Sequence, residues 1–212
     1  MQSLEQNLTF YPGGDRFNVR TAAVLLWQDR VLLSRDVPDA GYQFLPGGRV
    51  QLHEPAAQTI QRELREELRI DCSNQRLLWV VENFFTSAFY RRRTHEICFF
   101  YLVKAELPQR LTAHPEGEFL LHDDTDAINI PFTWVPLCAL PQTNLQPAFL
   151  KTRLQQPLPD QPAFLTVWDG EEGGTHENHL ICSGRNASAH GSGRVCQILY
   201  GAVGAEDGAA RL

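Results

Sequence analysis

The sequence lacks the features that define several large classes of protein. No two cysteines are spaced as C-x-x-C, and the five cysteines are odd in number and irregularly spaced. These absences argue against the usual zinc modules and against a disulfide framework. Cys98 and Cys138 lie in apolar stretches, and we expect both to be core thiols.

Long hydrophobic runs and an excess of positive charge are also missing. No stretch approaches the roughly 20 apolar residues of a membrane-spanning helix. The first eleven residues lack the basic start and apolar run of a signal peptide. We therefore expect a cytoplasmic protein with no membrane partner. The net charge is −6, and duplex binding relies on Lys and Arg to neutralise phosphates. We expect no duplex nucleic acid partner.

The remaining composition is that of a globular domain. The 212 residues are 43% hydrophobic and 21% charged, enough for a sizeable core. Helices and strands in this mixture predict a compact α/β or α+β sandwich. The helices are expected at Pro55–Leu68, where apolar residues recur every four positions, and at Leu145–Gln155. The strands are expected at Phe17–Trp27, Val31–Arg35, Leu77–Phe85, Glu96–Val103 and Phe132–Pro136.

The composition changes after Trp168. Residues 170–212 hold nine of the fifteen glycines, together with many Ser and Ala residues. Such a segment is typical of a poorly ordered tail. We therefore expect one domain at residues 1–169 and a tail at 170–212, in which only Arg194–Ala202 is expected to be able to form a strand.

Three glutamates on the first helix carry the clearest chemical signal. Glu63, Glu66 and Glu67 are three and four residues apart, so they share one face of the helix, where their charges repel. A solvated surface tolerates this repulsion, and so does a bound cation. Hard cations such as Mg²⁺ prefer carboxylate oxygens. Beside the Gly47-Gly48 turn, the cluster has the look of a metal platform, although for the glutamates taken alone a merely solvated helix face is the commoner case.

The segment from Gly48 to Ile70, which contains these glutamates, resembles the Nudix box. The pattern of that box is G-x5-E-x7-R-E-U-x-E-E-x-G-U, in which U is aliphatic. The segment departs from it at Arg69, where the pattern has glycine. The segments FLPGG at 44–48 and FTWVPL at 132–137 also look like those of the family, and the similarity covers roughly residues 17–168. The resemblance implies the Nudix fold, an α/β/α sandwich with a mixed β-sheet. The matching residues are Gly48, Glu54, Arg62, Glu63, Leu64, Glu66, Glu67 and Ile70.

The resemblance also implies an activity. It is the Mg²⁺-dependent hydrolysis of a phosphoanhydride bond in a nucleoside diphosphate linked to another group, for example ADP-ribose or a nucleoside triphosphate. Mn²⁺ is an alternative metal, and a homodimer is compatible with the family. The metal ligands implied are Glu54, Glu63, Glu66 and Glu67.

Other box residues have supporting roles by the same resemblance. Arg62 is expected to fix the carboxylates, and Gly47 and Gly48 to let the backbone approach the substrate closely. The general base in this family comes from varying places in the chain. Glu96 is the first candidate here, although a surface charge at a strand edge is an equally good interpretation. The other candidates are Glu116, Glu118 and Asp124.

Two other kinds of function remain open. A Nudix fold can serve as a non-catalytic ligand-binding or regulatory module, and the loss of box carboxylates would indicate this. An isomerase of the isoprenoid type would need a catalytic cysteine, for which Cys98 is the candidate. The complete box favours the hydrolase.

A hairpin outside the box carries two weaker signals. Arg91–Arg93 either contact substrate phosphates or form a solvated loop. The aromatic residues Phe84, Phe85, Phe89 and Tyr90 either stack on a base or pack within the hairpin.

Overall fold

The computed structural model describes residues 7–35, 41–72, 74–87, 91–123, 128–168 and 175–178. The chain divides into two units, Met1–Asn178 and His179–Leu212. The second unit lies wholly outside the described residues, as does the strand expected at Arg194–Ala202. Among the described residues, no helix has the length and apolar character needed to span a membrane.

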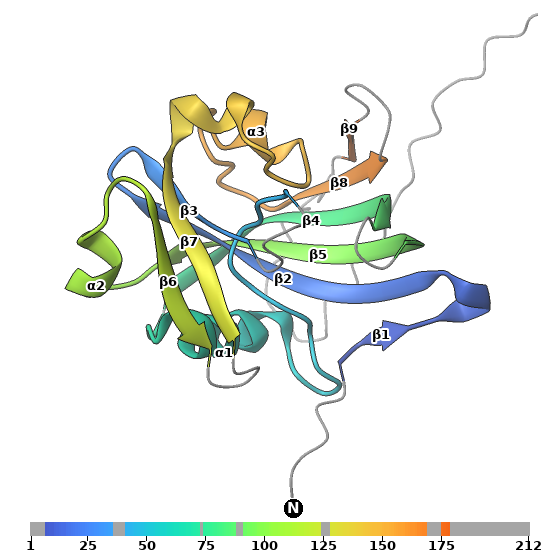
Figure 1. Ribbon diagram of the computed structural model, residues 1–212. Coiled ribbons are helices and arrows are strands. Elements are labelled where there is room, and N and C mark those ends of the chain that lie inside the picture. Colours follow the sequence, from blue (N-terminus) through green and yellow to red (C-terminus); the bar gives the residue numbers. More distant parts are fainter. Residues whose placement is uncertain are drawn as a thin grey trace, which may run out of the picture. The chain divides into compact units, whose positions relative to one another are not determined.

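The described strands form a mixed sheet, in the order β6-β7-β3-β2-β5-β4-β8-β9, with β1 paired to β2 (Figure 1). The pairs β2–β5 and β4–β8 are parallel, and the remaining pairs are antiparallel. The strands are β1 (Thr9–Phe10), β2 (Arg16–Trp27), β3 (Arg30–Ser34), β4 (Asn74–Ser87), β5 (Arg92–Lys104), β6 (Glu118–Asp123), β7 (Ile128–Pro136), β8 (Ala163–Trp168) and β9 (Thr175–Asn178).

Helices cover both faces of this sheet, with α1 and α3 on opposite sides of the central strands in Figure 1. Helix α1 buries Ile60, Leu64 and Leu68 in one core, and α3 buries Leu150 in the other. This arrangement confirms the α/β/α sandwich with a mixed sheet. The helices are α1 (Ala56–Leu68), α2 (Gln109–Thr112) and α3 (Leu150–Arg153), and the 3-10 helices are η1 (Pro12–Gly14) and η3 (Leu137–Gln142).

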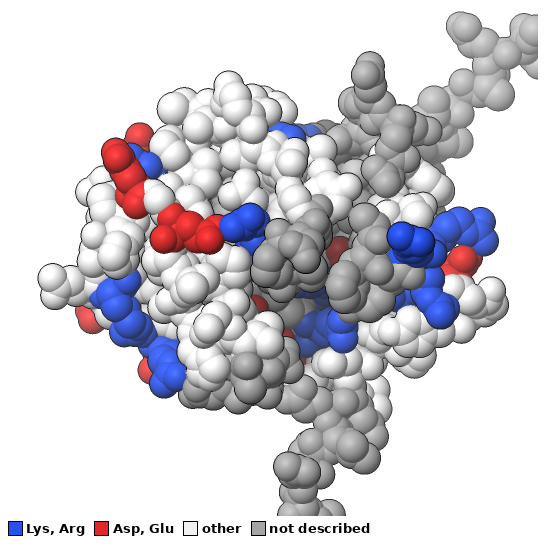
Figure 2. Space-filling view, in the orientation of Figure 1, with Lys and Arg blue, Asp and Glu red and all other residues white. Residues whose placement is uncertain are grey.

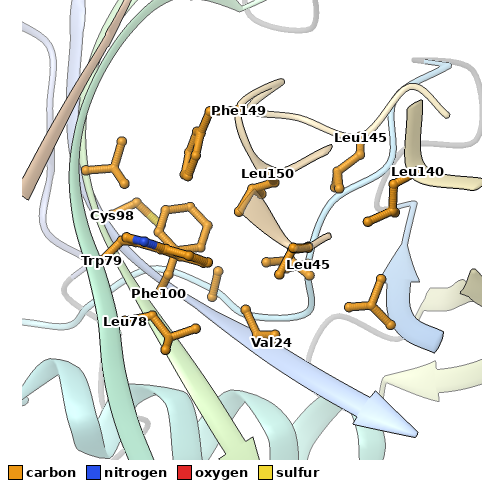
Figure 3. Close-up of a cluster of buried hydrophobic side chains, with 14 of the residues drawn as sticks. Val24, Leu45, Leu78, Trp79, Cys98, Phe100, Leu140, Leu145, Phe149 and Leu150 are labelled. Atoms are coloured by element: carbon orange, nitrogen blue, oxygen red, sulfur yellow. The ribbon is translucent and has the colours of Figure 1, made fainter. Parts of the chain in front are cut away.

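Aromatic rings fill the core on the α3 side (Figure 3). Trp79 of β4 meets Phe100 of β5 and Phe149 at ring-centroid distances of 6.3 and 6.0 Å. Phe100 and Phe149 meet each other edge to face at 5.7 Å. Such pairs contribute about 0.5–1.5 kcal/mol each beyond their buried area, so they fix α3 against the centre of the sheet.

Several local expectations were wrong. The second helix covers only Leu150–Arg153 rather than Leu145–Gln155. Leu145 forms an isolated bridge with Gln43 instead, and Pro147 has no N–H to donate within a helix. Cys138 is exposed in η3, whereas Cys98 is buried as expected.

The sheet also extends further than the sequence indicated. Strands β6 and β8 were not expected. Residues Thr175–Asn178 form β9, which pairs with β8 although it lies inside the segment expected to be a tail. Regular backbone pairing therefore reaches beyond residue 169, because the edge of β8 offers a partner that the local composition does not show.

Candidate active site

Helix α1 presents the carboxylates of the Nudix-like segment. Its apolar residues face the sheet, and this leaves the intervening polar residues on the flank of the helix. Pro55 precedes the helix in an extended conformation. Thr59, which is buried, donates its hydroxyl to Glu54 Oε2 at 2.8 Å. The helix and the loop before it are thus joined at Glu54.

Arg62 holds Glu54 through a bidentate ion pair. Its Nε donates to Oε1 at 2.9 Å and its Nη2 to Oε2 at 3.0 Å. Nη2 also donates to the Arg49 carbonyl at 3.1 Å. Burial acts to raise the pKa of Glu54, but the hydrogen bonds from Arg62 and Thr59 outweigh it and lower the pKa. Glu54 is therefore held as a carboxylate.

The same guanidinium contacts two glutamates of the helix. Arg62 Nη1 donates to Glu63 Oε1 at 2.8 Å and to Glu66 Oε2 at 3.0 Å. Burial of the guanidinium would lower the pKa of Arg62, but its partners Glu54, Glu63 and Glu66 raise it. Arg62 therefore brings three of the expected ligands together, as the sequence implied.

Glu63 lies deeper than the other partners of Arg62, with its side chain 13% exposed against 16% for Glu54 and 27% for Glu66. Its carboxylate packs against Gly48, where an added Cβ would lie 2.2 Å from Glu63 Cδ. Burial raises the pKa of Glu63 to about 7, with Arg62 opposing the rise and Glu66 adding to it. A nearby cation would favour the charged form. Glu67, the fourth expected ligand, is also buried, at 8% exposure.

These residues offer only oxygen donors, which suits Mg²⁺. Across the described ranges, no three acidic, histidine or cysteine side chains converge closely enough to hold a metal ion as they stand. Arg62 lies among Glu54, Glu63 and Glu66 and partly neutralises their charge. Binding a cation would therefore require Glu63 or Glu66 to turn from Arg62.

The Gly47-Gly48 turn closes the other side of the site. Gly47 has a φ of +143°, and a Cβ there would lie 2.3 Å from the Thr21 carbonyl oxygen. Arg20 Nη2 donates to the Gly47 carbonyl at 3.1 Å. Packing against Thr21 and Glu63 therefore explains why both positions are glycine.

Glu96 is not a surface charge at a strand edge. It lies within β5, between β2 and β4, and is 9% exposed. Its Oε2 accepts a 2.8 Å hydrogen bond from Nδ2 of the buried Asn18. The sequence missed Asn18, because only the parallel register of β2 and β5 places it opposite Glu96.

Arg20 contacts the box turn from the same strand that carries the partner of Glu96. The positive charge of Arg20 acts to lower the pKa of both Glu63 and Cys98, while Glu96 acts to raise that of Cys98. Arg20 lies two residues from Asn18 along β2, a span of about 7 Å. Glu63 and Cys98 therefore have Arg20 as a common electrostatic neighbour, and Asn18, which holds Glu96, lies beside Arg20 on the same strand.

The other candidates are less well placed. Glu116 is exposed, and Glu118 forms an exposed ion pair with Arg35. Asp124 lies outside the described residues. Burial, the largest cause, raises the pKa of the Cys98 thiol well above its ordinary value. A thiol in that state is a poor nucleophile, which weighs against the isomerase alternative.

The arginine run of the hairpin has structural partners. Arg92 Nη1 donates to the Gly14 carbonyl at 2.8 Å, and Arg93 pairs with Asp15 at 2.7 Å. Both contacts tie the start of β5 to the turn before β2. Phe84 packs between other rings, whereas Phe89 and Tyr90 lie outside the described residues.

Comparison with known proteins agrees with this geometry. Residues 17–153 match the NUDIX domain family. No curated protein matches the chain. Among solved structures, the MutT protein from Bacillus halodurans is 17% identical with a TM-score of 0.51, covering 71% of this chain and 89% of its own.

Two further structures are similar at lower scores. MutT NUDIX hydrolase from Burkholderia pseudomallei is 23% identical with a TM-score of 0.41, covering 66% of this chain and 98% of its own. An ADP-ribose pyrophosphatase from Streptococcus suis is 15% identical with a TM-score of 0.40, covering 72% of this chain and 98% of its own. At these identities the Bacillus structure supports the fold alone, and the other two carry no further weight.

A mixed sheet between helices, with three of the four box glutamates gathered around one arginine, defines a Nudix domain. The chain belongs to the NUDIX domain family, and the match spans well over half of its length. It is a Nudix hydrolase. The regulatory-module alternative depended on a loss of box carboxylates, and Glu54, Glu63, Glu66 and Glu67 are all present.

Proposed function

We propose that this Nudix hydrolase cuts a phosphoanhydride bond in a nucleoside diphosphate linked to another group, with Mg²⁺ as its metal and Mn²⁺ as a substitute. The observation that carries the proposal is the gathering of Glu54, Glu63 and Glu66 around Arg62 within 3.0 Å. ADP-ribose and nucleoside triphosphates are the first substrates to test.

The proposed metal ligands are Glu54, Glu63, Glu66 and Glu67. When bound, Mg²⁺ supplies positive charge that lowers the pKa of the attacking water and shields the phosphates. Arg62 orients the glutamates and partly neutralises them. Gly47 and Gly48 carry no side chain, so the backbone of this turn packs closely against Thr21 and Glu63 and is proposed to approach the substrate there, and Arg20 contributes a further positive charge at the turn.

Glu96 is proposed as the general base. Its burial and its hydrogen bond to Asn18, two residues from the Arg20 that contacts the Gly47 carbonyl, support this role. E96Q is expected to lower kcat and to change the acid limb of its pH profile, because a general base must be deprotonated to act. An unchanged profile would remove Glu96 from the proposed mechanism.

Partners and location follow from the same proposal. We propose a small nucleotide substrate, a cytoplasmic location, and no duplex nucleic acid or membrane partner. On the face shown in Figure 2, acidic and basic side chains lie in small separate groups. The described residues visible on that face therefore form no continuous basic field of the kind that duplex binding needs. A homodimer stays a proposal, which sedimentation would test.

The central test is substitution of the box glutamates. E66Q and E67Q each preserve shape but remove a charged ligand, so kcat should fall at least ~100-fold with folding retained. The assay is phosphate release over a nucleotide panel, with Mg²⁺ and with Mn²⁺. E106Q, at an exposed glutamate outside the box, serves as the control. Near-full activity in both box variants would remove the site from the proposal.

A further inference from the structure

Four aromatic side chains lie in register across four strands near one end of the sheet. Phe17 of β2 lies opposite His95 of β5, His95 opposite Phe84 of β4, and Phe84 opposite Trp168 of β8. We call these residues the aromatic row. Neither of the two cores formed by the described residues includes any of them. Core packing therefore does not explain the row.

The rings of the row contact one another closely. Phe84 stacks on Trp168 at 4.0 Å with an interplanar angle of 11°, and on His95 at 4.3 Å with an angle of 29°. Phe17 meets His95 edge to face at 5.2 Å. Trp168 nevertheless remains 47% exposed. Cross-strand packing stabilises the sheet here, but it does not require such a large exposed ring.

The aromatic row lines a pocket of about 680 Å³. This volume lies within the range of roughly 300–1,000 Å³ that is typical of small-ligand sites. Arg16, Thr94 and the ion pair of Asp15 with Arg93 also line the pocket, so polar groups stand beside the rings. A planar ring with polar edges fits this combination better than an aliphatic ligand, because such a ring can stack and also form hydrogen bonds.

The pocket and the box are connected along β2. Phe17 lies on the face of β2 that also carries Ala23 and Leu25, which pack in the same core as α1. Four residues after Phe17, the N–H of Thr21 donates to the Gly48 carbonyl at 2.9 Å. Four residues of extended chain span about 13 Å. A single nucleotide can therefore reach from the pocket to the turn that packs against Glu63.

We propose that this pocket binds the heteroaromatic base of the substrate, with Trp168 as its stacking platform. The inference rests on the proposed nucleotide-type substrate and adds the place where its base binds. Trp168 contacts the base, whereas Phe84 supports the Trp168 ring from behind. Because polar side chains lie beside the rings of the lining, a base with polar edges matches it better than the flat apolar face of a second copy would.

The test is binding to the full chain in EDTA, where the proposed metal-dependent hydrolysis cannot interfere. ADP and GDP are the probes, inorganic pyrophosphate is the base-free comparison, and calorimetry gives each Kd. Stacking of one base predicts that W168A raises the Kd for ADP or GDP by about 5- to 150-fold. The Kd for pyrophosphate should not change, and W168F should restore most of the affinity.

F164A is the matched control. Phe164 lies on the same strand, four residues from Trp168, is 36% exposed, and does not line the pocket. Its replacement should leave every Kd unchanged. In turnover assays, W168A should raise KM for the nucleotide far more than it lowers kcat, because the base lies away from the reacting bond.

Three results would overturn the inference. In the first, W168A binds ADP and GDP as the unmodified chain does. In the second, it weakens pyrophosphate binding equally. In the third, it changes the sedimenting mass but no Kd, which would make the row a contact between copies. Failure of hydrolysis over the whole nucleotide panel would instead count against the proposed function, because binding is measured without turnover.

Discussion

Gly48 sets the position of the Glu63 carboxylate at the scale of single atoms. A Cβ at residue 48 would lie 2.2 Å from Glu63 Cδ, well inside van der Waals contact. The atom that it would meet belongs to the end of a side chain rather than to the backbone. The fold can therefore accommodate a methyl group, but Glu63 must leave its place beside Arg62.

We therefore expect G48A to lower kcat by roughly 10-fold or more while the melting temperature changes little, since misplacing a group by about 1 Å can cost up to ~100-fold. Steady-state kinetics and thermal unfolding check this. G47A provides the contrast, because its φ of +143° and the 2.3 Å approach to the Thr21 carbonyl involve backbone. G47A should unfold at a lower temperature. A G48A enzyme with full activity would contradict the assigned geometry.

Glu63 should also make the stability of the metal-free protein depend on pH. Its pKa is about 7 in the fold and 4.5 in its ordinary environment. Between these pH values the folded protein keeps a proton that the unfolded chain releases. Stability is therefore lost as pH rises through this window. E63Q lacks this titration, whatever other changes it causes.

The expected outcome is measured by urea unfolding in EDTA at pH 5 and pH 8. From pH 5 to pH 8, the free energy of unfolding of E63Q should rise relative to that of the unmodified chain by on the order of 3 kcal/mol. This is the free-energy equivalent of the pKa difference. Added Mg²⁺ should reduce this rise, because a cation favours the charged carboxylate. If the difference in unfolding free energy between E63Q and the unmodified chain were the same at pH 5 and pH 8, Glu63 would ionise normally in the fold.

At the scale of elements, the end of α1 shows how the chain replaces the glycine of the Nudix box. Arg69 is left-handed, with φ 50° and ψ 42°, and its N–H donates to the Arg65 carbonyl at 3.1 Å. Arg110 Nη2 donates to the Leu68 and Arg69 carbonyls at 2.8 Å each. A cation at a helix C-terminus is stabilising, which offsets part of the cost of a side chain in this conformation.

R69G is expected to stabilise the fold by roughly 0.5–1 kcal/mol, because glycine adopts left-handed angles without a steric cost. Activity should change little, since Glu63, Glu66 and Glu67 keep their spacing. Denaturant unfolding and Michaelis–Menten kinetics check both parts. A raised KM with unchanged stability would instead indicate that the Arg69 guanidinium binds substrate phosphate.

The strongly periodic elements were the ones that the sequence predicted well. The spacing of Ile60, Leu64 and Leu68 predicted α1 to within a residue of its start, and the box placed Glu54, Arg62, Glu63 and Glu66 together. The parallel pairing of β2 with β5 was not predicted, because register depends on partners distant in sequence. Asn18 opposite Glu96 and the aromatic row both depend on such pairings, so the sequence alone could not reveal them.

At the scale of the molecule, the family match ends at residue 153, whereas the sheet continues to Asn178. Strand β8 pairs in parallel with β4, and β9 then pairs with β8. The added strands bring Trp168 beside Phe84. The continuation beyond the matched region therefore supplies the ring to which we assign base binding, while the box lies wholly inside that region.

This difference leads to a prediction for two truncations. A chain ending at Asn178 should unfold at the same temperature as the full chain and keep its kcat, because the glycine-rich composition of residues 179–212 gives them little apolar surface to bury. A chain ending at Gly170 also loses β9. Loss of its pairing with β8 should lower the free energy of unfolding by ~0.5–1.5 kcal/mol for each backbone hydrogen bond lost. Thermal unfolding and phosphate release measure both effects. If the chain ending at Asn178 were the one to unfold or aggregate, Arg194–Ala202 would have to contribute a strand to the fold.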